Sequence, residues 1–265
     1  MKDINAIFND ILNSKKYNNI CDELIFRICQ ETHGKYNKEK EIIKSVKAQL
    51  HAIYGAFFSD KCISQAETLI NSATLAQPIE QLAEQLLSLH ISSQERLPYI
   101  KDFYKFIFSI TGLPVSITDI GCAFNPFSIP YMSDEKLKSY YAFDIDKRLP
   151  PIINTYMTML KLPTLSSTLD IVSTVPKNYS DITFLFKIVP VIEHQKKGKT
   201  IDILTDINSK HVVITFPTKS LTGKNKGMEK HYSKFVKDSI TPYFNIVAST
   251  IIGNEYVVII RKSSN

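Results

Sequence analysis

The stretch ITDIGCAFNPF, residues 117–127, decides the fold class of this 265-residue chain. Two β-branched residues lead to an acid at Asp119, and a turn through a glycine and two small residues follows. A strand, an acid and a glycine turn form the arrangement by which many α/β proteins hold a nucleotide-type cofactor. Such a turn must be nearly free of side chains so that backbone can approach the ligand, and Gly121 and Ala123 meet this requirement.

The residues after this stretch alternate between short apolar runs and helical segments. The runs, between residues 116 and 216, are SITDI, YYAFDI, STLDIV, ITFLFKI and HVVITF. Alternation of this kind predicts a parallel sheet with covering helices. Farther on, YFNIVASTII and EYVVIIRK are separated only by Gly253 and Asn254, which predicts an antiparallel hairpin. We therefore expect an α/β, Rossmann-like domain over residues 111–265 that ends in this hairpin.

The residues before this domain show helical periodicity. NKEKEIIKSVKAQL and the residues after it predict a helix with an inward apolar face and lysines on another face. Its inward residues are expected to be Ile43, Val46, Leu50 and Ile53. YIKDFYKFIFSI predicts a second such helix, with Ile100, Phe103, Ile107 and Ile110 inward. Residues 1–110 are therefore expected to form an all-helical region.

Composition places the chain among ordinary globular proteins, because 44% of its residues are hydrophobic. No apolar run is long enough to span a bilayer, and the first residues lack the pattern of a signal peptide. The four cysteines form no C-x-x-C pair and have no histidine at ligand spacing. We therefore expect reduced thiols in a cytoplasmic protein, with no metal site and no membrane partner.

The net charge of +6 is unevenly placed along the chain. Residues 1–110 hold 13 basic and 13 acidic groups, whereas residues 111–265 hold 19 and 13. Within the second part, residues 219–237 carry six lysines against one glutamate. Such a cluster suits a polyanion, because each phosphate contact releases counterions. The plainer interpretation is a solvated loop and helix face.

Three acids stand at the ends of three successive predicted strands. Asp144 follows Asp119 by 25 residues, and a carboxylate there can accept both hydroxyls of a ribose. Asp170 at the next strand end can take an adenine amino group, with the Ile171 backbone N–H meeting a ring nitrogen. This ordered set predicts an adenosine-bearing ligand. The alternative is that Asp144 or Asp170 merely caps a following helix.

Two cofactors fit such a ligand. A dinucleotide needs G-x-G-x-x-G with its pyrophosphate at a helix N-terminus. Here the loop reads GCAFNP, so the second and third glycines are missing and Pro126 removes one backbone donor. S-adenosyl-L-methionine has no phosphate and does not need that cradle. The loop and the terminal hairpin therefore favour the methyl donor.

The fourth strand bears on the methyl acceptor. It continues as ITFLFKIVPVIEH and lacks the D/N-P-P-Y/F motif of many amino-group methyltransferases. No cysteine follows a strand in the Pro-Cys arrangement used to methylate pyrimidine carbon. A ring nitrogen with a free lone pair, such as guanine N7, remains as a candidate methyl acceptor. Transfer to it needs no general base, so rate would come from positioning and from exclusion of water, and we expect no catalytic acid–base residue.

Several motifs together resemble a known family. They are HISSQER, DIGCAFNP, FDID, VVITFPTKSLTGKNKGMEKHY and IGNE. In these motifs the chain resembles the aminoglycoside-resistance 16S ribosomal RNA methyltransferases, which methylate guanosine N7 in the decoding site of the small subunit. The resemblance runs from LHAIYGAFF to the C-terminus, and the first 45 residues match more loosely. It implies a helical rRNA-docking region, a Rossmann-like methyltransferase domain and S-adenosyl-L-methionine as donor.

The resemblance also implies roles for individual residues. Arg96 would grip the methionine carboxylate, and Gly121 would contact the donor by backbone. Asp144 would hold the ribose. The remaining cofactor-binding residues would be Phe57, His90, Ile91, Ser92, Asp170, Ile171, Phe186 and Gln195. Without the resemblance, Arg96 could equally form a helix-surface ion pair with Glu95 or Asp102.

The expected RNA contacts are lysines. They are Lys35, Lys40, Lys44, Lys187, Lys219, Lys224, Lys226 and Lys230. Lys187 could orient the target base or simply pair with Glu193. The expected partner is the small ribosomal subunit, bound by a monomer. Two rivals stay open: a nicotinamide-dependent reductase on a similar sheet, and a non-catalytic RNA-binding protein.

Overall fold

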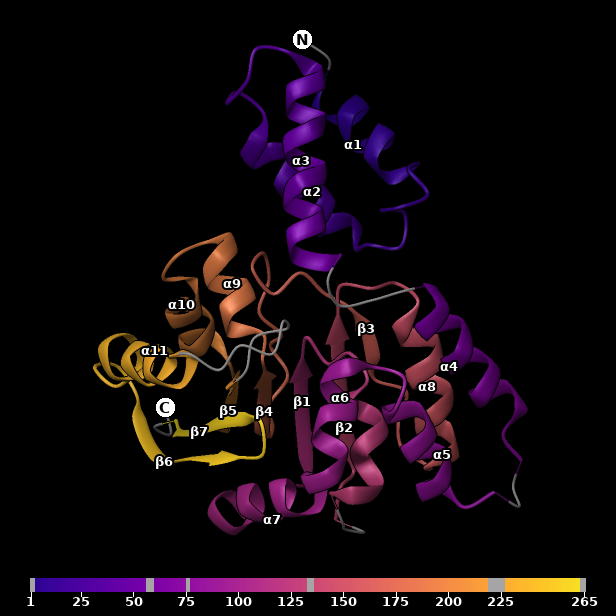
Figure 1. The fold of residues 1–265 in the computed structure, drawn as a ribbon, viewed down its shortest axis with the longest axis vertical. Coiled ribbons are helices and arrows are strands. Elements are labelled where there is room, and N and C mark those ends of the chain that lie inside the picture. The colour runs from indigo at the N-terminus through magenta and orange to yellow at the C-terminus, as the bar shows by residue number, and fades with distance from the viewer. Residues whose placement is uncertain (1–2, 56–59, 75–76, 133–135, 219–226, 263–265) are drawn as a thin grey trace.

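The computed structural model describes residues 3–55, 60–74, 77–132, 136–218 and 227–262. A seven-stranded sheet lies at the centre of the described chain, and helices pack around it (Figure 1). The strands are β1 (Ser116–Ile120), β2 (Ser139–Asp144), β3 (Ser166–Thr168), β4 (Ser180–Phe186), β5 (Ser209–Pro217), β6 (Asn245–Ile252) and β7 (Glu255–Arg261). The helices that precede the sheet are α1 (Ile4–Leu12), α2 (Asp22–Thr32), α3 (Glu39–Tyr54), α4 (Asp60–Ser72), α5 (Ile79–Leu87), α6 (Ile91–Arg96) and α7 (Ile100–Thr111). Those between its strands are α8 (Leu149–Met159), α9 (Val189–Gln195), α10 (Lys199–Asp206) and α11 (Met228–Phe235).

The strand order is β3-β2-β1-β4-β5-β7-β6. Strands β1 to β5 pair in parallel, and β7 inserts antiparallel between β5 and β6. The chain order reverses between β1 and β4, which is the point where open α/β sheets bind ligands. The predicted Rossmann-like sheet with a terminal antiparallel hairpin is therefore confirmed.

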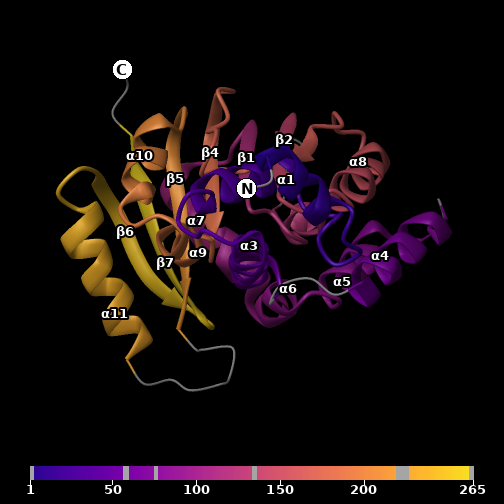
Figure 2. The same cartoon turned by 90° about the horizontal axis from the view of Figure 1, so that it is seen from above.

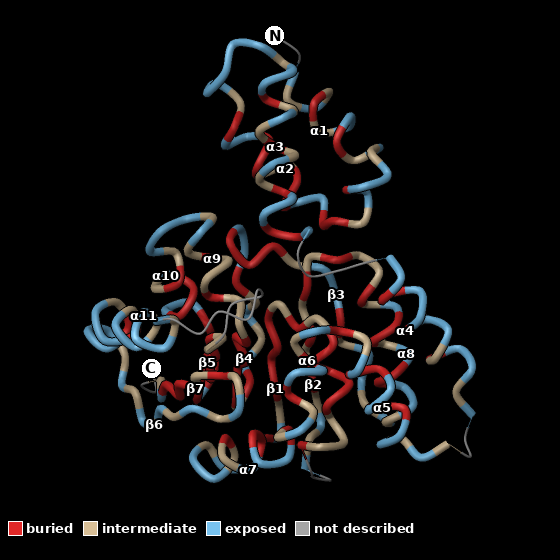
Figure 3. The backbone as a smooth tube through the Cα atoms, in the orientation of Figure 1, coloured by how far each residue is buried: buried red, intermediate tan, exposed pale blue. Residues whose placement is uncertain are grey.

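The sheet is buried on both faces because its strands alternate between two apolar cores. Val213 and Ile259 face a core that α4, α5, α7 and α8 complete, whereas Val212 and Ile260 face α9, α10 and the helical turn after α11. The tube in Figure 3 shows the resulting band of buried residues along the central strands. Continuous apolar runs such as HVVITF are the sequence pattern of strands covered on both sides.

The helices before residue 111 pack in two groups. Helices α1, α2 and α3 enclose an apolar core of their own, which includes Ile7, Leu24 and Leu50. This bundle, residues 3–54, is called the N-terminal lobe below, and Figures 1 and 2 show that it lies over the upper ends of the sheet strands. Helices α4, α5 and α7 instead contribute Ile63, Leu86 and Phe103, among others, to the core on one face of the sheet. The predicted boundary at residue 110 therefore marks the change from helices to strands along the chain. It does not separate the two cores, because α4, α5 and α7 pack against the sheet and not with α1, α2 and α3.

Two predicted core positions are less buried than expected. Ile42 is fully buried in α3, and Ile43 only packs partly against the lobe core. The buried residues of α3 are Ile42, Val46, Leu50, Ile53 and Tyr54, so the apolar face is wider than predicted and includes Ile42. Ile110, one residue before the end of α7, is 40% exposed.

The third predicted strand, STLDIV, is mostly not a strand. β3 ends at Thr168, and Asp170 begins a turn. The Asp170 carbonyl accepts from the backbone N–H of Ser173 and Thr174, and its side chain accepts from that of Val172. An acid that hydrogen-bonds its own following backbone favours a turn over a continued strand.

Candidate functional site

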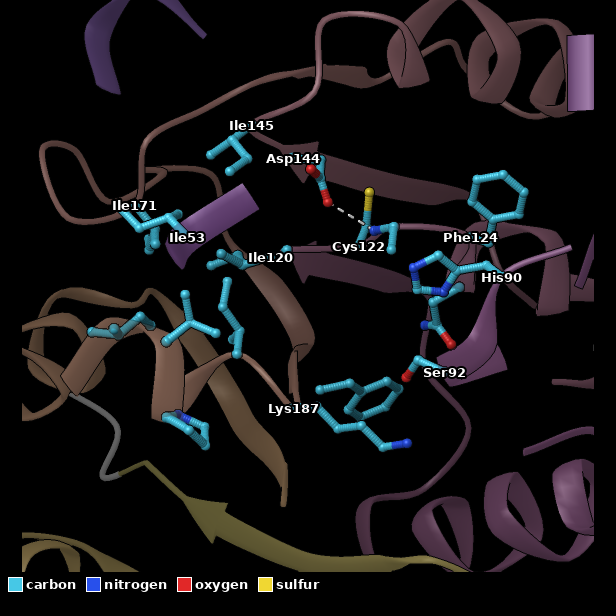
Figure 4. A pocket seen from close by; sticks show the side chains of 18 of the residues that line it. Ile53, His90, Ser92, Ile120, Cys122, Phe124, Asp144, Ile145, Ile171 and Lys187 are labelled. Carbon is cyan, nitrogen blue, oxygen red and sulfur yellow. Dashed lines mark hydrogen bonds between the residues drawn. The ribbon is translucent and has the colours of Figure 1, made fainter. Parts of the chain in front are cut away.

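One cavity of about 500 Å³ lies at the carboxyl ends of β1, β2 and β4. Ten of the eleven residues predicted to bind the cofactor line it: His90, Ile91, Ser92, Arg96, Gly121, Asp144, Asp170, Ile171, Phe186 and Gln195. The eleventh, Phe57, lies outside the described residues. The wall is mostly apolar, and in Figure 4 the rings of His90 and Phe124 lie side by side, with centroids 5.4 Å apart. A cavity of this size and character suits a small organic ligand.

The glycine loop adopts left-handed backbone at two positions. Gly121 has a φ of 67°, and a Cβ built there would lie 2.3 Å from Cδ1 of Ile188. Ala123 has a φ of 43°, which is uncommon for a residue with a side chain and recurs at functional sites. The Gly121 and Cys122 N–H groups both donate to the carbonyl of Phe143, which fixes the loop against β2.

Asp144, the last residue of β2, forms a hydrogen bond with the glycine loop. Its Oδ2 accepts from the backbone N–H of Ala123 at 2.9 Å, and its Oδ1 accepts from that of Asp146 at 3.1 Å. Burial raises the pKa of Asp144 to about 6, although these backbone hydrogen bonds act in the opposite direction. A carboxylate with two oxygens at the cavity wall can still accept hydrogen bonds from a ligand hydroxyl pair.

Asp170 is held by an arginine that sequence reasoning missed. Arg27 of α2 donates from Nε to Oδ2 of Asp170 at 2.6 Å and from Nη2 to Oδ1 at 3.3 Å. The same Nη2 donates to Oε1 of Gln195 at 2.7 Å. Nothing in the sequence marks Arg27, because its partners lie 143 and 168 residues away along the chain.

Arg96 does not lie on a helix surface, so the predicted alternative pairing with Glu95 or Asp102 is wrong. The guanidinium is 2% exposed and lies 4.7 Å from the ring centroids of both Phe103 and Phe186. It forms a double hydrogen bond with Glu255 of β7, and its Nη1 donates to Oδ1 of Asn125 at 2.7 Å. Burial would raise the pKa of Glu255, but Arg96 and Lys187 outweigh it and lower that pKa.

Lys187 follows β4 directly, has a φ of 57° and also lines the cavity. Its Nζ lies 3.1 Å from Glu95 and 3.7 Å from Oε1 of Glu255. The predicted pairing with Glu193 is wrong, because that carboxylate accepts from the backbone N–H groups of Gly198 and Thr200.

Asp119, the first acid of the predicted series, faces away from the cavity. Its Oδ2 accepts from the Tyr140 hydroxyl at 2.6 Å and from Nδ2 of Asn125 at 2.9 Å. Burial raises its pKa to about 6, against these hydrogen bonds. Asp119 therefore stabilises the loop from behind, and two of the three strand-end acids, Asp144 and Asp170, line the cavity.

The lysines predicted to contact RNA are only partly described. Lys35, Lys40, Lys44 and Lys230 are exposed. Lys219, Lys224 and Lys226 lie outside the described residues. Within the described ranges, no group of three or more metal-ligating side chains gathers, and no helix is long and apolar enough to cross a membrane.

Comparison with known proteins gives consistent matches over most of the chain. The model of the ribosomal RNA methyltransferase (FmrO) family matches residues 13–258. A 16S rRNA (guanine(1405)-N(7))-methyltransferase of Proteus mirabilis is 30% identical over 275 residues, covering 98% of this chain and 97% of that protein. A protein of the same name from Serratia marcescens is 28% identical over 260 residues, covering 98% and 99%.

Solved structures agree with these matches. The 16S rRNA methyltransferase RmtF in complex with S-adenosyl-L-homocysteine has a TM-score of 0.85 at 25% identity, covering 99% of this chain and 100% of that one. The 16S rRNA methylase ArmA has a TM-score of 0.60 at 31% identity, covering 76% of this chain and 96% of that one. The likeness to RmtF therefore includes the N-terminal lobe as well as the sheet.

Proposed function

This chain belongs to the ribosomal RNA methyltransferase (FmrO) family, and we propose that it transfers a methyl group from S-adenosyl-L-methionine to guanosine N7 in the decoding site of 16S rRNA. The substrate assignment rests on the names of its relatives, which are guanine-N7 methyltransferases of 16S rRNA. The expected consequence, by the same family resemblance, is resistance to aminoglycosides.

One observation carries the proposal: the Gly121 loop, Asp144 and Asp170 line a single cavity where the sheet order reverses. The loop suits S-adenosyl-L-methionine, which has no pyrophosphate, better than a dinucleotide. Ala123 and Pro126 occupy the second and third positions at which the pyrophosphate cradle of a dinucleotide needs glycine. The nicotinamide-dependent reductase is therefore the weaker hypothesis.

The residues of this chain would act by binding and orientation. The donor supplies a methyl group on a positively charged sulfur, and guanine N7 attacks with its own lone pair. No proton leaves N7, so no general base is needed, and the apolar cavity wall can serve by excluding water. Asp144 would accept the ribose hydroxyls, and Asp170 with the Ile171 N–H would read the adenine. Arg96, His90, Ile91 and Ser92 line the cavity where the methionine end is assigned.

The non-catalytic RNA-binding protein is the second rival. Asp144, Asp170 and Arg96 are all present and line the cavity, which favours an enzyme over a protein with a vestigial pocket. We further propose that the protein works in the cytoplasm, where ribosomes lie, and as a monomer.

The decisive experiment has two parts. Calorimetry with S-adenosyl-L-methionine and with NAD should give binding only with the former. Incubation of small ribosomal subunits with labelled donor, followed by mapping of the modified base, should place the methyl on the N7 of one decoding-site guanosine. Binding of NAD alone, or label on another base, would overturn the proposal.

A further inference from the structure

The N-terminal lobe forms part of the wall of the cavity. Leu24 of α2 and Ile53 and Tyr54 of α3 line it together with the strand ends of the sheet. These three side chains are buried, and all three also belong to the lobe core. Figure 1 shows the lobe placed directly over the strand ends, so a ligand in the cavity touches both parts of the molecule.

Arg27 joins the two parts by charge. The guanidinium extends from α2 and donates to Asp170, in the turn after β3, and to Gln195, the last residue of α9. Each oxygen of Asp170 accepts one hydrogen bond from Arg27 and one from its own turn, namely from the Val172 N–H and the Ser173 hydroxyl. Since Asp170 is 2% exposed, withdrawal of Arg27 would leave a buried carboxylate without its counter-charge.

A second set of contacts ties the lobe to the loop that follows Asp144. The Cys21 N–H donates to the carbonyl of Ile145 at 2.8 Å, and the Lys147 N–H donates to that of Asn19 at 2.8 Å. The Tyr54 hydroxyl donates to Oδ2 of Asp146 at 2.7 Å. Both acids that line the cavity, Asp144 and Asp170, are therefore positioned by segments that the lobe holds.

We propose that the lobe is a structural part of the donor site, with Arg27 as the positioning residue that couples donor binding to docking on the ribosomal subunit. The inference rests on the proposed function for the identity of the two ligands. Donor in the cavity favours the seated lobe, because it contacts lobe and sheet together. The seated lobe in turn presents a fixed docking surface, so each ligand raises the affinity for the other by the same factor.

The test compares binding of subunits with and without S-adenosyl-L-homocysteine, which fills the donor site but transfers no methyl. In the wild-type protein this product should tighten subunit binding by at least about fivefold. Arg27→Met keeps the length of the side chain and removes its charge. It should weaken the binding of S-adenosyl-L-homocysteine in calorimetry. The coupling ratio, which is the dissociation constant for subunits without S-adenosyl-L-homocysteine divided by that with it, should fall close to one.

Two further variants separate positioning from folding. Arg27→Lys retains a charge near Asp170 and should restore part of the coupling. Glu31→Gln removes only the exposed partner of Arg27 and should behave as wild type. A wild-type ratio of one, or an Arg27→Met variant that keeps the full ratio, would overturn the inference. Failure of the protein to bind S-adenosyl-L-homocysteine or subunits at all would instead contradict the proposed function.

Discussion

Arg96 donates from Nε to Oε1 of Glu255 at 2.8 Å and from Nη2 to Oε2 at 3.0 Å. The pair joins the end of α6 to the first residue of β7, 159 residues later in the chain. Both groups are almost completely buried, and Phe103 and Phe186 cover the guanidinium. The terminal hairpin is thereby attached to the wall of the cavity, which explains how an antiparallel pair of strands far from the glycine loop contributes to the site.

Loss of one partner of this pair should be strongly destabilising. Glu255→Gln leaves the buried Arg96 charge without a counter-charge and should lower the free energy of unfolding by about 3–5 kcal/mol in urea titrations. Asp238→Asn breaks the exposed pair between Lys234 and Asp238 and should cost at most about 1 kcal/mol. Similar losses of unfolding free energy in the two variants would show that the buried pair does not stabilise the fold.

The same pair predicts a response to acid. The pKa of Glu255 is lowered in the folded protein, so the unfolded chain takes up the proton first as the pH falls. The stabilisation is complete above the ordinary glutamate pKa of about 4.3 and disappears as the pH drops through the lower folded value. Urea titrations between pH 7 and pH 3 should show this loss in the wild-type protein, and it should be smaller in Glu255→Gln.

Asp144 predicts how donor binding depends on pH. Its pKa of about 6 in the free protein means that a growing fraction is protonated below pH 6, and the protonated form has lost acceptor capacity. Donor affinity should therefore fall as the pH drops below 6, and Asp144→Ala should lose about 1.5–3 kcal/mol of binding at pH 7.5. Calorimetry from pH 5 to 8 measures both.

Asp119 supplies the control for this experiment, since its pKa is also raised to about 6 by burial but its side chain lies behind the loop. Asp119→Asn should keep the pH dependence of donor binding. An unchanged dissociation constant in Asp144→Ala would contradict the ribose assignment.

Two glycines at positive φ but in different surroundings test the loop. Gly121→Ala and Gly112→Ala should both lose stability, and Gly112→Ala should lose more because its ψ of 166° lies in a region that almost only glycine adopts. A Cβ at Gly112 meets nothing within 4 Å, whereas one at Gly121 displaces Ile188, which lines the cavity. Donor affinity should therefore fall in Gly121→Ala only. Equal donor affinity in both variants would exclude close approach of the donor to Gly121.

Local and periodic signals predicted the sheet and the residues of the cavity well. The Gly253-Asn254 turn defines the hairpin without help from the rest of the chain, and parallel pairing brings strand ends together. Strand register was harder to predict. Asp119 pairs with Ala142, two residues before Asp144, so it lies deeper in the sheet than Asp144 and hydrogen-bonds Tyr140 instead of lining the cavity.

The long-range ion pairs of Arg27 and Glu255 could not be predicted from one sequence. Arg27 sits on an ordinary amphipathic helix, and Glu255 opens an apolar strand beside a turn. Neither position carries a local pattern, because its chemistry depends on a residue more than 140 positions away. Only packing of the lobe and of the hairpin against the sheet brings these charges to the cavity.

The lysines of residues 219–237 are expected to contact RNA phosphates and not the donor. Lys230 is exposed on α11, and Lys224 and Lys226 precede it in the sequence. Replacing these three with Ala should flatten the salt dependence of subunit binding by about one unit of slope per lost contact. Lys101→Ala with Lys105→Ala, on exposed positions of α7 far from the lobe in Figure 1, should leave the slope unchanged. If the first set also has no effect, the cluster is only a solvated face.

The substrate should be the assembled small subunit and not free rRNA. A lobe with its own core is larger than a cofactor site needs, and its Lys35, Lys40 and Lys44 are exposed. Folded RNA offers little base-edge information in its grooves, so a docking surface of this size would recognise the shape of the RNA. The catalytic domain then has to capture one unstacked guanine, at a cost of a few kcal/mol. Docking contacts offset that cost only where the RNA is already held in its subunit conformation.

Label from the donor should therefore enter subunits strongly and protein-free rRNA weakly. Removal of the whole lobe would not be a clean test, because Leu24, Ile53 and Tyr54 line the donor cavity. Replacing Lys35, Lys40 and Lys44 with Ala is cleaner, since these side chains are exposed and none of them lines that cavity. This variant should bind the donor as the wild type does and lose most incorporation into subunits. Equal incorporation into naked rRNA, or full activity of the triple variant, would refute docking through the lobe.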